Sequence, residues 1–235
     1  YAVDAETGSQ EWAFETGNRV YSSPTVVDGT VFVGGGINLY AVAADTGEQE
    51  WAFDTGSTVS SSPTVVDGTV FVGSWDTDLH AVDADTGEQE WAFETGGNIQ
   101  SSPTVVDGTV FVGSNDGNLY AVDAETGSQE WAFETGNRVY SSPTVVDGTV
   151  FVGGGINLYA VAADTGEQEW AFDTGSTVSS SPTVVDGTVF VGSWDTDLHA
   201  VDADTGEQEW AFETGGNIQS SPTVVDGTVF VGSND

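Results

Sequence analysis

Short runs of alternating apolar and polar residues, bounded by turn residues, recur along the whole chain. Residues 22–27 (Ser-Ser-Pro-Thr-Val-Val) are followed by Asp28-Gly29 and then by residues 30–33 (Thr-Val-Phe-Val). An Asp-Gly pair between two such runs indicates a two-residue β-hairpin, because Gly accepts the positive φ of a type I′ turn. Residues 39–42 and 49–53 form two further runs. Since no stretch has a helical period of about 3.6 residues, we predict an all-β chain with four antiparallel strands per segment.

The four-strand segment recurs six times. Residues 1–116 return without a change as residues 120–235. Repeats of about 40 residues are typical of solenoids and propellers, and small four-stranded sheets bury their faces by radial stacking. We therefore predict a single six-bladed β-propeller over residues 1–235, with 24 strands and two identical three-blade halves. The segments start at Tyr1, Tyr40, His80, Tyr120, Tyr159 and His199.

The ends of the chain fall inside a segment. Residues 220–235 supply the first two strands of a blade, and residues 1–16 supply the other two. We predict that both termini meet in this shared blade, which closes the ring and removes exposed sheet edges. The alternatives are a window cut from a longer array and a larger assembly that shares blades between chains.

Each segment carries the pattern Ala-x-Asp-x-x-Thr-Gly-x-x-x-Trp or a near variant, with Ala43 and Ala162 in place of Asp in two segments. With the Ser-Ser-Pro and Asp-Gly elements, this pattern resembles the pyrroloquinoline quinone (PQQ)-like repeat of quinoprotein β-propellers. The resemblance implies that the Trp lies on the outer strand and packs against the neighbouring blade, where its N–H needs an acceptor. Asp4 can cap the turn at Thr7 through its side chain. The six structural tryptophans are Trp12, Trp51, Trp91, Trp131, Trp170 and Trp210.

The segments differ mainly in two places, the connections between blades and the loops between second and third strands. In a meander blade both emerge on the same face, and scaffold loops are where binding sites usually lie. We hypothesise a polar ligand-binding rim on this face; the alternative is that the loops are only solvated. The rim comprises Arg19, Tyr21, Trp75, Asp76, Asp78 and Gln100, with the copies Arg138, Tyr140, Trp194, Asp195, Asp197 and Gln219.

Two smaller patterns concern metal and proton chemistry. Residues 76–78 and 115–118 offer clustered oxygen atoms, the ligand type for Ca²⁺ or Mg²⁺, but they lack the spacing of an EF-hand loop. The sequence therefore predicts no cofactor, with calcium as an alternative. His80 and His199 take the place of a Tyr in the other segments. We interpret them as packing or surface residues, because no second His, Cys or Ser-based triad accompanies them.

The charge balance excludes several classes of partner. The chain has 38 Asp+Glu, 2 Lys+Arg and no Cys, for a formal net charge of -36. Two cations cannot neutralise a nucleic-acid backbone, and the negative charge disfavours an anionic membrane surface. No apolar run approaches the ~20 residues of a membrane-spanning helix.

The resemblance also extends to quinoprotein alcohol and glucose dehydrogenases, which bind PQQ over a Trp floor with a calcium ion. The lack of Cys and the doubled sequence favour a scaffold over one asymmetric active site. We therefore predict a non-catalytic, monomeric scaffold for an unidentified protein partner. A propeller that binds a small ligand or a divalent cation is the alternative, and a PQQ-dependent dehydrogenase is less favoured.

The composition also bears on the origin of the chain. Many acids with almost no Lys are similar to the proteins of halophiles, in which PQQ-like repeats are often exported. We expect an extracellular or cell-surface protein of a halophile. The identical halves indicate a recent duplication, or engineering from such a parent.

Overall fold

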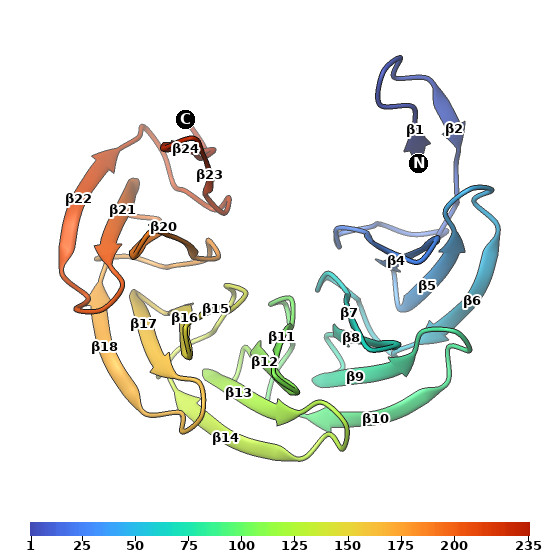
Figure 1. Ribbon diagram of the computed structural model, residues 1–235, viewed down its shortest axis with the longest axis horizontal. Helices are drawn as coiled ribbons and strands as arrows, with labels where there is room; N and C mark the ends of the chain where they lie inside the picture. Colours follow the sequence, from blue (N-terminus) through green and yellow to red (C-terminus); the bar gives the residue numbers. More distant parts are fainter. The chain divides into compact units, whose positions relative to one another are not determined.

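The computed structural model describes residues 1–235 (Figure 1). The chain forms 24 β-strands and no helix, which confirms the all-β prediction. It divides into two compact units, Tyr1–Pro103 and Thr104–Asp235, called here the N-terminal and the C-terminal unit. The chain therefore contains no helix that could span a membrane.

The N-terminal unit contains one two-stranded and two four-stranded sheets, all antiparallel. The two-stranded sheet pairs β1 (Ala2–Val3) with β2 (Gln10–Trp12). The first four-stranded sheet consists of β3 (Thr25–Val27), β4 (Thr30–Gly35), β5 (Asn38–Ala43) and β6 (Gln49–Asp54). The second consists of β7 (Thr64–Val66), β8 (Thr69–Gly73), β9 (Asp78–Asp83) and β10 (Gln89–Glu94).

The C-terminal unit continues the same meander with three four-stranded sheets and one two-stranded sheet. Its first sheet consists of β11 (Thr104–Val106), β12 (Thr109–Gly113), β13 (Asn118–Asp123) and β14 (Gln129–Glu134). The second consists of β15 (Thr144–Val146), β16 (Thr149–Gly154), β17 (Asn157–Ala162) and β18 (Gln168–Asp173). The third consists of β19 (Thr183–Val185), β20 (Thr188–Gly192), β21 (Asp197–Asp202) and β22 (Gln208–Glu213). The two-stranded sheet pairs β23 (Thr223–Val225) with β24 (Thr228–Phe230).

Two kinds of turn set the register of each sheet. Asp28 and Gly29 have φ of 48° and 85°, and they join β3 to β4 with Val27 opposite Thr30, as expected for a two-residue type I′ hairpin. At the outer turn after β9, Asp83 Oδ1 accepts hydrogen bonds from Thr86 N and Thr86 Oγ1, both at 2.7 Å. These bonds lower the pKa of the exposed Asp83 carboxyl. The same bonds recur at Asp123 and Asp202, whereas Ala43 and Ala162 leave the outer turn without them in two sheets.

The tryptophans of the outer strands dock on the following sheet of the same unit. Trp51 on β6 donates its Nε1–H to Ala84 O at 2.9 Å. Gly87 lies against this indole, where φ is +72° and an added Cβ would come within 2.7 Å of the ring, so both conformation and space favour glycine. Bonds of 2.9 Å also join Trp12 to Ala44, Trp131 to Ala163, and Trp170 to Ala203.

Apolar side chains fill the space between successive sheets of each unit. In the N-terminal unit, buried Phe32, Leu39 and Trp51 pack with Val70 and Val72 of the next sheet. The equivalent cluster in the C-terminal unit joins Phe151, Leu158 and Trp170 to Val189 and Val191. Such burial between stacked sheets is what a propeller repeat requires.

The sheets at the two ends of the chain differ from the others. The predicted shared blade would be four-stranded, whereas β1–β2 and β23–β24 are each a two-stranded sheet of their own unit. Their apolar side chains are correspondingly more exposed. Phe230 on β24 is 57% exposed where Phe151 is 2% exposed. The four-stranded sheet before it is also affected, since Trp210 on β22 is 40% exposed where Trp170 is 9% exposed.

Candidate functional site

Hydrogen bonds join the variable loops to the variable connections within each unit. In the N-terminal unit, Gly36 N donates to Arg19 O at 3.1 Å and Trp75 N donates to Thr58 O at 3.0 Å. In the C-terminal unit, the same bonds link Gly155 to Arg138 and Trp194 to Thr177, at 3.3 and 3.0 Å. The loop before each third strand therefore lies beside the connection that precedes its sheet.

Arg19 and Tyr21 form a pair in the first of these connections. Arg19 Nη1 donates to Tyr21 Oη at 3.2 Å, and this hydrogen bond raises the pKa of the Arg19 guanidinium. Arg138 and Tyr140 form the same pair at 3.0 Å, again with a raised pKa for Arg138. The single arginine of each unit is therefore engaged by a phenol and by no carboxylate.

Trp75 is an exposed aromatic residue held at a fixed position. Its Nε1–H donates to Ser60 Oγ at 2.9 Å, while 40% of the residue stays exposed. Trp194 makes the same bond with Ser179 Oγ at 2.9 Å. Gln100 is half-buried and its copy Gln219 is exposed. The rim residues thus fall into separate groups, the Arg–Tyr pair, the anchored Trp and the Gln, which no side-chain hydrogen bond connects.

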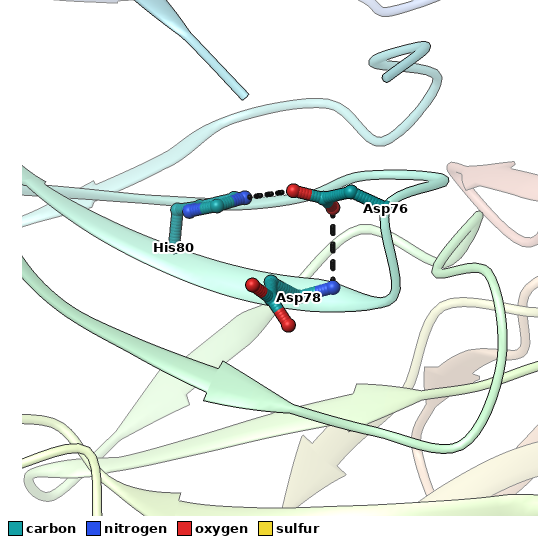
Figure 2. A group of neighbouring side chains, drawn as sticks. All are labelled: Asp76, Asp78 and His80. Atoms are coloured by element: carbon teal, nitrogen blue, oxygen red, sulfur yellow. Dashed lines mark hydrogen bonds and ion pairs between the residues drawn. The ribbon is translucent and has the colours of Figure 1, made fainter. Parts of the chain in front are cut away.

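The rim residues Asp76 and Asp78 form a tight cluster with His80, which was not among the predicted rim residues (Figure 2). His80 Nε2 lies 2.9 Å from Asp76 Oδ2, and Asp76 Oδ1 accepts the Asp78 backbone N–H at 3.1 Å. One potential ligand atom from each of the three side chains lies within 4.8 Å of the others. Asp195, Asp197 and His199 repeat the cluster in the C-terminal unit, with the His–Asp contact again at 2.9 Å.

The strand positions the members of this cluster. Asp78 and His80 are alternate residues of β9 and therefore share one of its faces. The turn before β9 places Thr77 at φ 87°, a conformation that a β-branched residue rarely adopts. His80 is buried, and its ring packs edge-on against Phe53 with centroids 5.3 Å apart. His80 is thus a packing residue that also binds Asp76, a role that the sequence analysis missed although the Asp-x-Asp-x-His spacing signals it.

The surroundings of Asp78 disfavour the ionised form of its carboxyl group. Burial raises the pKa of Asp78, and the Asp76 carboxylate raises it further. Glu94, opposite Asp78 on β10, acts in the same direction, whereas His80 acts against it. The site therefore concentrates negative charge that no arginine or lysine compensates.

In the following repeat along the chain, different residues occupy the equivalent positions. Asp116, Asn118 and Tyr120 take the places of Asp76, Asp78 and His80. Tyr120 Oη donates to Asp116 Oδ2 at 2.7 Å, and Asn118 Nδ2 donates to Asp116 Oδ1 at 3.2 Å. Burial and the Asp116 carboxylate raise the pKa of Tyr120 to about 12. Here one carboxylate accepts from two side-chain donors and from the Asn118 backbone N–H at 2.9 Å.

The quinone cofactor suggested by the resemblance does not fit these residues. PQQ is an anionic tricarboxylate, so its binding requires cationic or other hydrogen-bond-donating partners. The rim indoles Trp75 and Trp194 are bordered by Asp76 and Asp195, and the only arginine of each unit donates to a tyrosine. We therefore derive no chemistry through PQQ.

Comparison with protein families finds one matching family along the whole chain. The family described as outer membrane protein assembly factor BamB matches residues 1–104, 76–177 and 154–235. A comparison with curated proteins returned no match.

Several solved structures share the fold. BamB from Moraxella catarrhalis is 21% identical with a TM-score of 0.82, covering 97% of this chain and 75% of that chain. The computationally designed Ika8 protein is 17% identical with a TM-score of 0.86, covering 97% of this chain and 72% of that chain. Quinohemoprotein alcohol dehydrogenase from Pseudomonas putida is 21% identical with a TM-score of 0.72, and the match spans 86% of this chain but 43% of that chain. At these identities the likeness establishes the fold and not the activity.

Proposed function

Because the chain belongs to the family of the outer membrane protein assembly factor BamB, a family of PQQ-like repeat β-propellers, we propose that it is a non-catalytic scaffold for protein interaction. The observation that carries this proposal is the arrangement of its variable residues. The sheets repeat nearly the same sequence, while the loops and connections that differ are hydrogen-bonded together within each unit. A repeated scaffold with one variable edge suits recognition of a partner.

The proposed binding surface is the rim. Its exposed Tyr21 and Trp75 are residue types that contribute strongly to protein interfaces. The anchoring of Trp75 by Ser60 supports this role, because a fixed side chain loses less conformational entropy on binding. The name of the family suggests a partner among outer membrane proteins in an unfolded or partly assembled state.

Residue swaps between repeats test this function. Fluorescence anisotropy of a labelled, denatured outer membrane protein would measure binding to the full chain. We expect binding to weaken when Arg19, Tyr21 and Trp75 are replaced by Thr, Ser and Asn, the residues at Thr58, Ser60 and Asn115, with the same changes in the copies. Asn in place of Asp28 and Asp147, in the hairpin turns, is the control. Equal affinity of the rim variant and the unchanged chain would contradict the rim.

We also propose that residues 1–235 form a single six-bladed propeller closed by a blade shared between the termini. Each unit has an apolar groove beside its two-stranded sheet. The groove in the N-terminal unit has a volume of about 530 Å³ and is lined by Trp12, Val31 and Val33. The groove in the C-terminal unit has a volume of about 780 Å³ and is lined by Trp210 and Phe230. Exposed apolar grooves of this kind favour association with strands that cover them, which in this proposal are the strands of the other terminus.

The internal repeat gives the register for closure. Val112 pairs with Tyr120 in the complete sheet β11–β14, so Val231 is expected to pair with Tyr1. Because the chain has no cysteine, Tyr1→Cys with Val231→Cys would introduce the only disulfide. Oxidation to a crosslinked monomer supports closure within one chain. A crosslinked dimer would indicate blades shared between chains.

A cation-binding propeller is the second candidate function, and the Asp76–Asp78–His80 cluster favours it.

The dehydrogenase alternative is tested by adding PQQ and Ca²⁺ and following the absorbance spectrum and dye-linked oxidation of alcohols. We expect no turnover, since the only arginine of each unit is bound to a tyrosine.

We place the scaffold in the cell envelope or outside the cell, and in a halophile. The family name supports an envelope location, and the net charge of -36 supports a high-salt environment. Self-repulsion at low salt destabilises a compact state, and the Debye length falls to about 3 Å at 1 M salt. The melting temperature is expected to rise between 0.05 and 3 M KCl, because the added salt screens the repulsion between the carboxylates. A melting temperature independent of salt would contradict the halophilic origin.

A further inference from the structure

We propose that the Asp76–Asp78–His80 cluster, and its copy Asp195–Asp197–His199, each bind a divalent cation that prefers mixed nitrogen and oxygen ligands, of which Zn²⁺ is the representative. This inference is independent of the scaffold function and concerns two sites per chain. It rests on the donor set, on electron pairs that the protein leaves without partners, and on a contrast between repeats.

The cluster supplies three ligand atoms in a compact arrangement. One nitrogen and two carboxylate oxygens lie within 4.8 Å of one another, and Figure 2 shows the His80 ring and the Asp76 carboxylate directed toward each other. Two ligands on tetrahedral Zn²⁺ with bonds of about 2.0–2.1 Å lie about 3.3 Å apart. His80 Nε2 and Asp76 Oδ2 are 2.9 Å apart, so a cation that replaces the shared proton requires a separation of roughly 0.4 Å more.

The protein leaves other electron pairs of the cluster without a hydrogen-bond partner. The His80 side chain is 5% exposed, and its Nδ1 has no hydrogen-bond partner; the same holds for His199 Nδ1. The contact with the Asp76 carboxylate holds a proton on His80 Nε2, so a neutral ring keeps its unpartnered electron pair on Nδ1. Asp78 uses its backbone N–H to bond Asp76, while its carboxylate accepts no hydrogen bond. A buried ring nitrogen without a hydrogen-bond partner is costly unless a ligand or a water molecule completes it.

The contrast with the following repeat indicates that these unpartnered ligand atoms belong to the cluster and are not a general feature of the fold. Asn118 and Tyr120 are hydrogen-bond donors to Asp116. In the cluster, Asp78 replaces the amide donor with a carboxylate that only accepts, and His80 replaces the phenol with an imidazole, whose nitrogen can exchange its proton for a metal ion. The backbone is the same, since Ser74 N and Ser114 N each bond to the first residue of the following strand at 3.1 and 2.9 Å.

The negative charge of the site favours a cation, and the imidazole nitrogen of His80 indicates which class of cation. Asp76, Asp78 and Glu94 bring three carboxylates together, and the only arginine of the unit donates to Tyr21. Ca²⁺ takes six to eight oxygen ligands, more than this site offers. Imidazole with carboxylates suits Zn²⁺ and neighbouring transition metals, with water completing the coordination.

Calorimetric titration of the full chain with Zn²⁺ tests the proposal. The titration is made in about 0.5 M KCl, where the Debye length is only about 4 Å, with excess Mg²⁺ to occupy the surface carboxylates. We expect two equivalents of Zn²⁺ for the unchanged chain. We expect one for D78N/H80Y, and none at the same concentration when D197N/H199Y is added. Affinity at an altered site should fall at least about tenfold, as loss of ligand positioning alone already does.

The variants have a matched control within the chain. Asp78→Asn with His80→Tyr creates the set already present at Asn118 and Tyr120, so the fold accommodates it. D67N/D186N removes the same number of charges at hairpin turns, where Asn tolerates positive φ, and it should keep two equivalents. Two equivalents in the fourfold variant, or Ca²⁺ displacing Zn²⁺ at equal concentration, would overturn the proposal.

An NMR measurement tests the same sites without a variant. His80 and His199 are the only histidines of the chain, so their imidazole ¹⁵N signals are readily resolved. We expect both to shift when Zn²⁺ saturates the sites, because the metal ion replaces the proton on the coordinating ring nitrogen. Imidazole signals that stay unchanged while Zn²⁺ binds would place the ion on surface carboxylates and refute the proposal.

Discussion

The turns before β9 and before β13 present the same backbone with different chemistry. At β13 a phenol and an amide satisfy one carboxylate, with the Tyr120–Asp116 bond at 2.7 Å. At β9 an imidazole faces Asp76 at 2.9 Å, and Asp78 brings a second carboxylate. The ring–Asp contact is thus kept, while the donor beside it is lost. This difference shows that a repeat can retain its structural hydrogen bond and still change what its loop is able to bind.

The largest expected effect comes from removing the ring. His80→Ala deletes a buried side chain and its bond to Asp76, and should lower the free energy of unfolding by about 2–4 kcal/mol. His80→Tyr should be close to neutral, because Tyr120 occupies the equivalent place. Denaturant unfolding of both variants measures this difference. Equal destabilisation by Ala and Tyr would mean that the two repeats are not interchangeable at this position.

The second effect concerns the turn backbone. Thr77 has φ 87° where the following repeat has Gly117 at φ 98°. Thr77→Gly should raise the free energy of unfolding by about 1 kcal/mol, since strain of about 1–3 kcal/mol is relieved and partly offset by chain entropy. Thermal unfolding measures the gain, and Thr196→Gly should repeat it. Gly117→Thr should destabilise, because its Cβ would also approach Asn137 N at 3.3 Å; no effect in either direction would show that the turn relaxes freely.

A third effect is confined to the repeat with the phenol. The Tyr120 pKa is raised to about 12, chiefly by burial and then by Asp116. A raised pKa in the folded state stabilises the fold below the ordinary tyrosine pKa, and this contribution is lost as the pH rises toward 12. Ultraviolet titration should show one tyrosine ionising near pH 12, and Asp116→Asn should lower its pKa. An unchanged titration in Asp116→Asn would remove the carboxylate as a cause.

The smallest expected difference lies at the outer turns, where the two repeats are alike. Hydrogen bonds from threonine lower the pKa of Asp83 and Asp123. A lowered pKa stabilises the fold above the unfolded-state value, and this contribution is lost as the pH falls through the folded-state pKa. Asp83→Ala and Asp123→Ala should therefore flatten the acid side of the stability curve equally. Unequal effects would reveal a difference between these sheets beyond the cluster.

Local pattern was sufficient to predict most of the fold. The Asp28-Gly29 hairpin and the four strands of each segment follow from alternation and turn chemistry, which act over a few residues. Exposure at the ends does not follow from local pattern. Trp170 and Trp210 lie in nearly identical sequence, yet Trp210 is 40% exposed and Trp170 is 9% exposed, because burial depends on the strands that follow and not on the motif.

The site was less predictable than the fold. Variation between repeats identified Arg19, Trp75 and Asp76 as rim residues, but it did not show which residues they form hydrogen bonds with. The Trp75–Ser60 and His80–Asp76 bonds depend on rotamers and on how a loop meets the preceding connection. Whether the rim residues act together stays a prediction, since the structure distributes them among separate groups.

The docking of each outer-strand tryptophan on the following sheet has a consequence for cooperativity. Where Trp51 binds Ala84 O and Trp170 binds Ala203 O, a sheet is coupled to its neighbour and to no sheet beyond it. Stability then accumulates as a sum of nearest-neighbour terms, as in a one-dimensional lattice. Opening is expected to start at the two-stranded end sheets and to travel inward, so amide exchange should be fastest at β1–β2 and β23–β24 and slowest in the middle of each unit.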